Sequence, residues 1–188
     1  MSNQMHCVES KIGNVGNVVF LDIDGVLNNY KSMGFGEPCD IECARHVRRI
    51  CTFANADIVV SSTWRIGNST YNLQEILYIV GLNRVIGRTA SNDPSLKDRG
   101  DEIKKWIDTY GCNNYVILDD DNDMLPEQKD NFIHVDGYKG ITEEESNYAI
   151  RNIFKVDTEF CKTCRGYFRV GDNKCTDCNK KQYIGLIL

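Results

Sequence analysis

Apolar residues occur along the chain in two patterns, continuous runs and helical spacing. Continuous apolar runs predict buried strands at residues 17–22, 58–60 and 115–118, with shorter candidate strands at 84–86 and 132–135. Apolar residues at helical spacing predict helices at residues 40–54, 71–80 and 100–110, and a further helix beginning at Thr142. Because the strands are apolar throughout and alternate with helices, we expect a parallel sheet covered on both faces, which is an α/β fold.

Start signals support two of these helices. Asp40 is a suitable N-cap for the helix at 40–54, since its carboxylate can accept from the free N–H groups of the first turn. Thr142 and Glu145 have the spacing of a capping box. Residues 28–40, which contain two glycines and a proline, are predicted to form a loop.

The composition is that of an ordinary globular chain. Of its 188 residues, 41% are hydrophobic and 26% are charged, which allows one core and at most a small additional unit. No apolar run approaches the ~20 residues that a transmembrane helix needs, and the start lacks a signal-peptide pattern, so we expect a cytoplasmic protein. The net charge of −5 argues against a broadly basic nucleic-acid binder.

Two carboxylates follow the first predicted strand. Asp22 and Asp24 are one residue apart, directly after an apolar run and before Gly25. In parallel sheets, sites form at the carboxyl ends of strands, so both side chains can face one opening. One carboxylate can then act as a nucleophile while its neighbour donates and accepts protons. The alternative interpretation is a turn that merely uses Asp and Gly.

Hydroxyl side chains follow the second predicted strand. Ser61, Ser62 and Thr63, together with the backbone N–H groups of a tight turn, can bind a phosphate. Arg65 could add a bidentate contact to the same group. The alternative is a polar turn around a packed Trp64.

An acidic cluster and two cations complete the candidate chemistry. Residues 119–123 carry four aspartates directly after a buried strand, where they repel one another unless a hard cation such as Mg²⁺ lies among them. Lys97 and Arg99 precede a predicted helix, and either could balance the charge of a nucleophile and a transferred phosphoryl group.

In this order, the motifs resemble those of the haloacid dehalogenase (HAD) superfamily of phosphohydrolases, over roughly residues 17–154. The strings LDIDGVLN, SSTWR, RGDEIKKWID and VILDDDNDM look like a small-cap branch found in phage and bacterial proteins and in RNA-repair fusions, and GITEEESNYAI looks like its last helix. The resemblance implies a HAD-like Rossmannoid parallel sheet with a minimal cap.

The resemblance also implies roles for individual residues. Asp22 would attack phosphorus, and Asp24 would protonate the leaving oxygen and then activate water. Ser62, or Ser61 if the alignment slips by one, would bind the phosphoryl oxygens, and Lys97 or Arg99 would stabilise charge. The implied Mg²⁺ ligands are Asp22, the carbonyl of Asp24, Asp119 and either Asp120 or Asp123.

The short interval between Asp24 and Ser62 leaves no room for a large cap domain, so we expect an open site. The leading hypothesis is a Mg²⁺-dependent phosphomonoester hydrolase that forms a phospho-aspartate. Its substrate would be a nucleotide or a nucleic-acid terminal phosphate. The alternatives are a small-metabolite phosphatase and a catalytically inactive HAD-like binding or regulatory module.

Four of the nine cysteines form two Cys-x-x-Cys pairs near the end of the chain, at Cys161, Cys164, Cys175 and Cys178. This spacing is typical of a closed, structural Zn²⁺ site in a zinc ribbon. We therefore expect a HAD-like domain at residues 1–156 and a zinc-ribbon module at 157–188. The ribbon either only stabilises the chain or recognises nucleic acid or protein. Recognition would use its aromatic residues (Phe160, Tyr167, Phe168 and Tyr183) and its cations (Arg165, Arg169, Lys180 and Lys181).

Overall fold

A five-stranded, entirely parallel sheet forms the centre of the protein. The computed structural model describes residues 15–30, 39–90, 95–161, 163, 167–172 and 175. The strands are β1 (Val15–Leu21), β2 (Ala56–Val60), β3 (Val85–Arg88), β4 (Cys112–Asp119) and β5 (Phe132–His134), in the order β3-β2-β1-β4-β5. The five predicted strands and the α/β class are confirmed.

The helices lie in the segments between and after the strands. They are α1 (Ile41–Ala54), α2 (Thr70–Tyr78), α3 (Arg99–Tyr110) and α4 (Glu143–Tyr148). Shorter helical turns are η2 (Thr63–Arg65), η3 (Pro126–Asn131) and the π-helical η4 (Ala149–Ile153). Asp40 caps α1, and Thr142 and Glu145 form the predicted capping box of α4.

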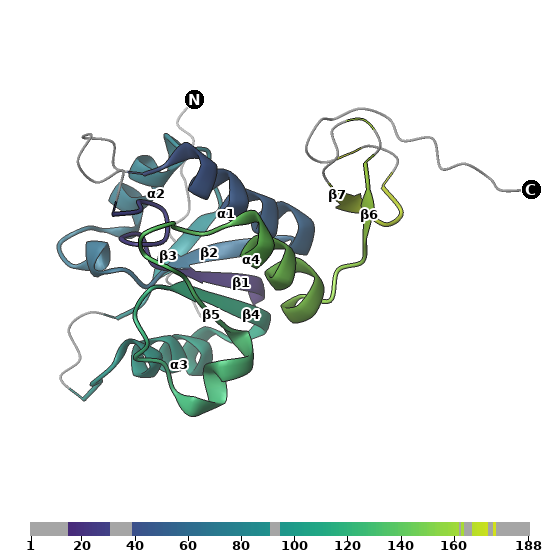
Figure 1. Ribbon diagram of the computed structural model, residues 1–188. Coiled ribbons are helices and arrows are strands. Elements are labelled where there is room, and N and C mark those ends of the chain that lie inside the picture. The colour runs from purple at the N-terminus through teal and green to yellow at the C-terminus, as the bar shows by residue number, and fades with distance from the viewer. Residues whose placement is uncertain are drawn as a thin grey trace, which may run out of the picture.

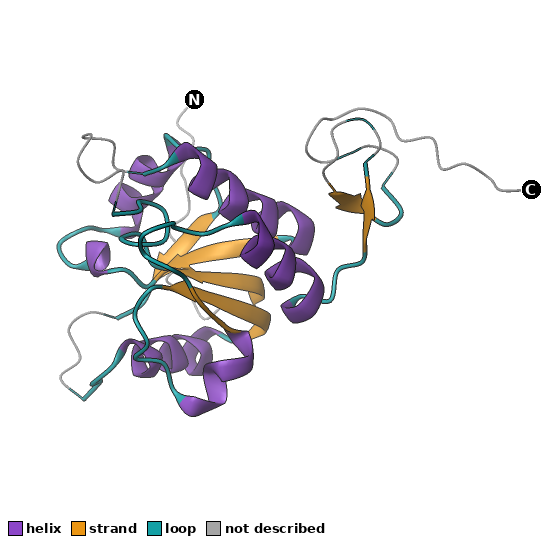
Figure 2. Ribbon diagram, in the orientation of Figure 1, coloured by secondary structure: helices purple, strands orange, loops and turns teal. Residues whose placement is uncertain are grey.

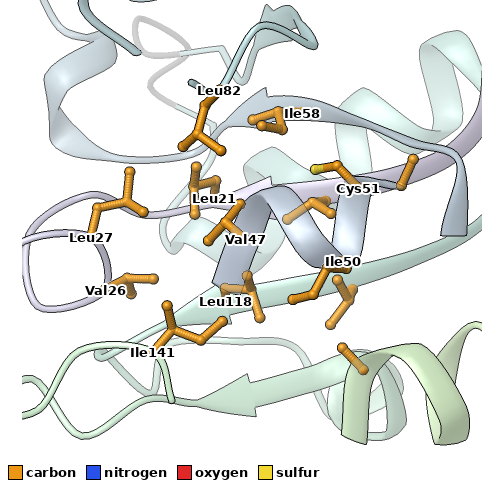
Figure 3. Close-up of a cluster of buried hydrophobic side chains, with 14 of the residues drawn as sticks. Leu21, Val26, Leu27, Val47, Ile50, Cys51, Ile58, Leu82, Leu118 and Ile141 are labelled. Carbon is orange, nitrogen blue, oxygen red and sulfur yellow. The ribbon is translucent and has the colours of Figure 1, made fainter. Parts of the chain in front are cut away.

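Helices cover both faces of the sheet, with α1 and α4 on one face and α3 on the other (Figures 1 and 2). Alternate residues of β1 divide between the two cores: Val19 and Leu21 join the cluster under α1, whereas Val18 and Phe20 join the cluster under α3. Figure 3 shows the first cluster, in which Leu21 lies close to Val47 of α1. The continuous apolar runs of the sequence therefore reflect strands that are buried on both sides.

The segment between Asp24 and Ser62 adds no cap domain within the part of the chain that is described. After a turn at Gly25–Tyr30 comes α1, which packs in the core; residues 31–38 of this interval lie outside the described residues. Across the described ranges, no helix combines the length and the apolar character needed to cross a membrane.

A small antiparallel hairpin follows the α/β unit. Its strands are β6 (Thr158–Phe160) and β7 (Tyr167–Arg169). Cys161, Phe168 and Cys175 form a buried cluster, so the Phe168 ring serves as core rather than as an exposed stacking surface. Cys164 and Cys178 lie outside the described residues, as do Arg165, Tyr183, Lys180 and Lys181.

Candidate active site

Strand register brings the three strand-end motifs together. Leu21 of β1 is paired with Val60 of β2 and with Leu118 of β4, so the residues that follow each of them meet at one edge of the sheet. The amide of Asp22 donates to the Leu118 carbonyl at 3.0 Å, and the amide of Ser61 donates to the Leu21 carbonyl at the same distance. The predicted convergence of these motifs is therefore a direct consequence of parallel pairing.

Arg99 connects two of the acidic residues. Its Nη1 lies 2.5 Å from Asp22 Oδ1 and 2.7 Å from Asp119 Oδ2, and its side chain is nearly buried. Lys97 is exposed, and its backbone amide donates to the carboxylate of Asp101. Of the two predicted cations, the structure thus brings Arg99 to the carboxylates.

Asp22, Asp119 and Asp120 form a compact carboxylate cluster, with one oxygen of each within 4.8 Å of the others. Asp123, the predicted alternative to Asp120, instead accepts from the backbone amide of Arg99 at 3.1 Å and so caps the start of α3. The geometry therefore favours Asp120 over Asp123 as a metal ligand, since carboxylate oxygens gathered in this way are what Mg²⁺ prefers.

Burial and mutual repulsion perturb the two inner carboxyls. Burial raises the pKa of Asp22 to about 6, although Arg99 and the Ser62 hydroxyl act in the opposite direction. Burial, together with the negative charge of Asp22, raises the pKa of Asp119 to about 7. Burial opposes the charge of Arg99, but the carboxylates of Asp119 and Asp22 outweigh it and raise the pKa of the guanidinium. When Asp22, Asp119 and Asp120 are all ionised, their three negative charges exceed the one positive charge of Arg99 by two, an excess that a divalent cation would neutralise.

Asp24 is held separately from this cluster by two hydrogen bonds. Its Oδ1 accepts from Asn28 Nδ2 and its Oδ2 accepts from Trp64 Nε1, each at 2.8 Å. Both donors orient the carboxylate without neutralising it. The sequence predicts only a packed ring at Trp64, because nothing in the spacing of SSTWR indicates where its indole N–H points.

Gly25, which directly follows Asp24, lies where any other residue is strained. Its φ of +78° lies in the left-handed region, and a Cβ there would overlap the carboxylate of Asp120. The glycine allows the backbone after Asp24 to approach Asp120, the residue that follows β4, closely.

The serines after β2 are fully buried beside Asp22. The Ser62 hydroxyl accepts from the backbone N–H of Trp64 at 3.3 Å and lowers the pKa of Asp22 by a hydrogen bond. The Ser61 hydroxyl has no hydrogen-bond partner among the described residues, although it is buried. Thr63, by contrast, is exposed. A buried hydroxyl without a hydrogen-bond partner destabilises the folded state unless a ligand provides the missing hydrogen bond.

Arg65 turns away from the position expected for a phosphate ligand. Its guanidinium donates to Glu102 of α3 at 2.6 Å and to the Ser61 carbonyl at 2.8 Å. These contacts attach the serine turn to α3. A direct phosphate contact by Arg65, which the sequence predicted, therefore has no geometric support.

Comparison with known proteins was made for families, curated proteins and solved structures. A family model described as "HAD domain in Swiss Army Knife RNA repair proteins" matches residues 18–146, which include all four predicted motifs. Neither the curated proteins nor the solved structures contained a match. The chain therefore belongs to the family of HAD domains found in Swiss Army Knife RNA repair proteins.

Proposed function

We propose that this chain is a Mg²⁺-dependent phosphomonoester hydrolase that works through a phospho-aspartate on Asp22. The observation that carries the proposal is the Arg99 bridge between Asp22 and Asp119, beside a cluster of three carboxylates. HAD domains are generally hydrolases, and many are phosphatases, which agrees with this arrangement. A phosphoryl-transfer site needs little more than such positioning and charge stabilisation.

The reaction proceeds in two steps. A carboxylate oxygen of Asp22 attacks phosphorus, the bond to the ester oxygen breaks, and the carboxylic acid of Asp24 protonates that oxygen so that an alcohol leaves. The Asp24 carboxylate then takes a proton from water, whose oxygen bonds to phosphorus. Cleavage of the acyl-phosphate bond releases inorganic phosphate and restores Asp22.

The surrounding groups stabilise charge during both steps. The Arg99 guanidinium faces the nucleophile and can also contact a phosphoryl oxygen. The unpartnered Ser61 hydroxyl and the Ser62 hydroxyl supply donors for the other phosphoryl oxygens.

Asp22, Asp119 and Asp120 would hold Mg²⁺, together with the backbone carbonyl of Asp24. The donor set fits this ion, because it consists of oxygens and carries the net negative charge described above. When bound, Mg²⁺ supplies further charge stabilisation to the phosphoryl oxygens. Asp123 is better assigned to capping α3.

The test is Mg²⁺-dependent turnover of an aryl phosphate by the full chain. We expect Asp22→Asn to abolish activity, and Arg99→Ala to lower kcat/KM by about 10²-fold or more. Lys97→Ala serves as the matched control, because its side chain is exposed and should leave activity near that of the wild type. Turnover that does not depend on Mg²⁺ or on Asp22 would contradict the proposal.

The proposed substrate is a nucleotide or a nucleic-acid terminal phosphate. Two observations support it: the family is described from RNA repair proteins, and the described residues between Asp24 and Ser62 form no cap domain. A panel of mononucleotides, sugar phosphates and 5′- or 3′-phosphorylated oligonucleotides tests this class. Preference for sugar phosphates would favour a small-metabolite phosphatase, and binding without turnover would favour an inactive module.

We further propose that residues 157–188 form a zinc ribbon on four thiolates. The support is the spacing of Cys161, Cys164, Cys175 and Cys178, together with the β6–β7 hairpin and the burial of Cys161 and Cys175. A segment this short cannot build a sufficient core, so metal binding would supply its folding energy.

A further inference from the structure

Two exposed tyrosines lie beside the carboxylate cluster. Tyr30 follows the turn after β1, and Tyr138 lies in the loop between β5 and α4. They are 48% and 67% exposed, yet their rings contact each other, with centroids 5.4 Å apart and planes at 80°. In such an edge-to-face pair, much of the ring surface is left for another planar group.

Tyr30 is hydrogen-bonded to the carboxylate cluster, and Tyr138 is held next to it through its contact with the Tyr30 ring. The Tyr30 hydroxyl donates to Asp120 Oδ2 at 2.7 Å, and the Tyr30 amide donates to the Gly137 carbonyl at 3.0 Å. A Cβ at Gly137 would lie 2.7 Å from both Asp120 Oδ2 and the Tyr30 ring, so these loops pack as closely as a glycine allows. Tyr138 is the next residue, and its amide donates to Asp136 Oδ1 at 3.1 Å. The ring pair is thereby pre-organised next to the proposed catalytic centre.

The charges in the described parts of these loops favour recognition of a nucleobase over recognition of a phosphate backbone. Within the described segments 28–30 and 135–141, Lys139 is the one cation, and it is paired with Asp136 at 2.8 Å. A surface that followed a nucleic-acid backbone would present unpaired Lys or Arg along it. Exposed tyrosines, in contrast, stack on nucleobases without requiring charge.

We propose that Tyr138, supported edge-on by Tyr30, is the stacking platform for the nucleobase of the nucleotide whose phosphate enters the site. This rests on the proposed function and deepens it, because it assigns recognition of the terminal nucleotide to a base-stacking contact. The phosphate lies at Asp22, and the base of the same nucleotide lies over the ring pair.

The test compares a nucleoside monophosphate with ribose 5-phosphate, which has the same sugar phosphate but no base. We expect Tyr138→Ala to lower kcat/KM for the nucleotide by about 5- to 150-fold, the range typical of one stacked base, and to change that for ribose 5-phosphate little. Tyr138→Phe keeps the ring and should keep the preference. Tyr78→Ala is the matched control, since Tyr78 is 69% exposed at the far end of α2.

Equal losses on both substrates, or no loss on the nucleotide, would overturn the platform. Adding 3′-phosphorylated and 5′-phosphorylated mononucleotides and short oligonucleotides shows whether the stacked base belongs to a free nucleotide or to a nucleic-acid end. The same comparison by equilibrium binding in an Asp22→Asn background does not require turnover. If the Asp22→Asn protein binds the nucleotide better than ribose 5-phosphate only when Tyr138 is present, base stacking on Tyr138 is supported even if the phosphatase proposal fails.

Discussion

At the scale of single residues, two hydrogen bonds fix the orientation of the Asp24 carboxylate. Trp64 donates to one of its oxygens and Asn28 to the other, both at 2.8 Å, so the carboxyl group has one orientation. A general acid must lie within hydrogen-bonding reach of the leaving oxygen, and small misplacements are costly. In the proposed mechanism, Trp64 is thus a positioning residue, because it acts through Asp24.

Replacing Trp64 by Phe removes the N–H donor and keeps an aromatic ring. We expect a loss in kcat/KM that is about tenfold greater for an alkyl phosphate than for p-nitrophenyl phosphate, because only the alkoxide needs protonation to leave. Trp106→Phe is the control, since this second tryptophan belongs to α3 and packs in the core on the other face of the sheet from Trp64. Equal losses on both substrates would indicate a merely structural role.

At the scale of elements, the turn after β1 connects the nucleophile with the end of β4. Gly25 and Gly67 both have positive φ, at +78° and +82°, but only the Cβ of a residue at 25 would meet a neighbour, the Asp120 carboxylate. Comparing the same substitution at these two positions therefore separates the effect of backbone strain from the effect of displacing the proposed metal ligand Asp120.

Gly67→Ala should cost about 1–2 kcal/mol in the free energy of unfolding and leave Mg²⁺ affinity unchanged. Gly25→Ala should cost more and should also weaken Mg²⁺ binding, because the added methyl displaces Asp120. Denaturant unfolding and Mg²⁺ titration measure the two effects. Equal behaviour of the two variants would show that the turn does not constrain Asp120.

The proposed zinc site in the segment of the β6–β7 hairpin can be tested by metal content. If four thiolates hold zinc, metal analysis should find about one equivalent per chain. Cys175→Ser should lower that content strongly, whereas Cys112→Ser, at the start of β4, should not. Aryl phosphatase activity and its Mg²⁺ requirement should survive in Cys175→Ser. Full zinc content in this variant would exclude the proposed ligand set.

At the scale of the whole molecule, the acidic site affects stability. The pKa values of Asp22 and Asp119 are raised to about 6 and about 7, well above the ordinary value for Asp, so the folded state holds more protons than the unfolded chain between about pH 4 and 7. Stability of the metal-free protein therefore falls as pH rises through this range, by up to roughly 3 kcal/mol for Asp22 and roughly 4 kcal/mol for Asp119.

We expect the Tm in chelator to decrease between pH 5 and 8 to a greater extent than in Mg²⁺, because the cation binds the ionised carboxylates and stabilises the folded state. Thermal unfolding at several pH values measures this. Asp119→Asn should flatten the pH dependence in chelator, since it removes one of the two groups. A stabilisation by Mg²⁺ that is largest at pH 5 would contradict the assignment.

The sequence by itself determined the strands, the helices, the caps at Asp40 and Thr142 and the order of the strand-end motifs. These follow from local patterns of burial and from the rule that parallel strands end at one edge. Only the tertiary structure placed Arg99 against Asp22 and Asp119 and grouped Asp120 with them. It also paired Arg65 with Glu102, Trp64 with Asp24, and Tyr30 with Tyr138. The physical reason is that a side chain's direction depends on register and on packing partners distant in sequence, which neither composition nor spacing records.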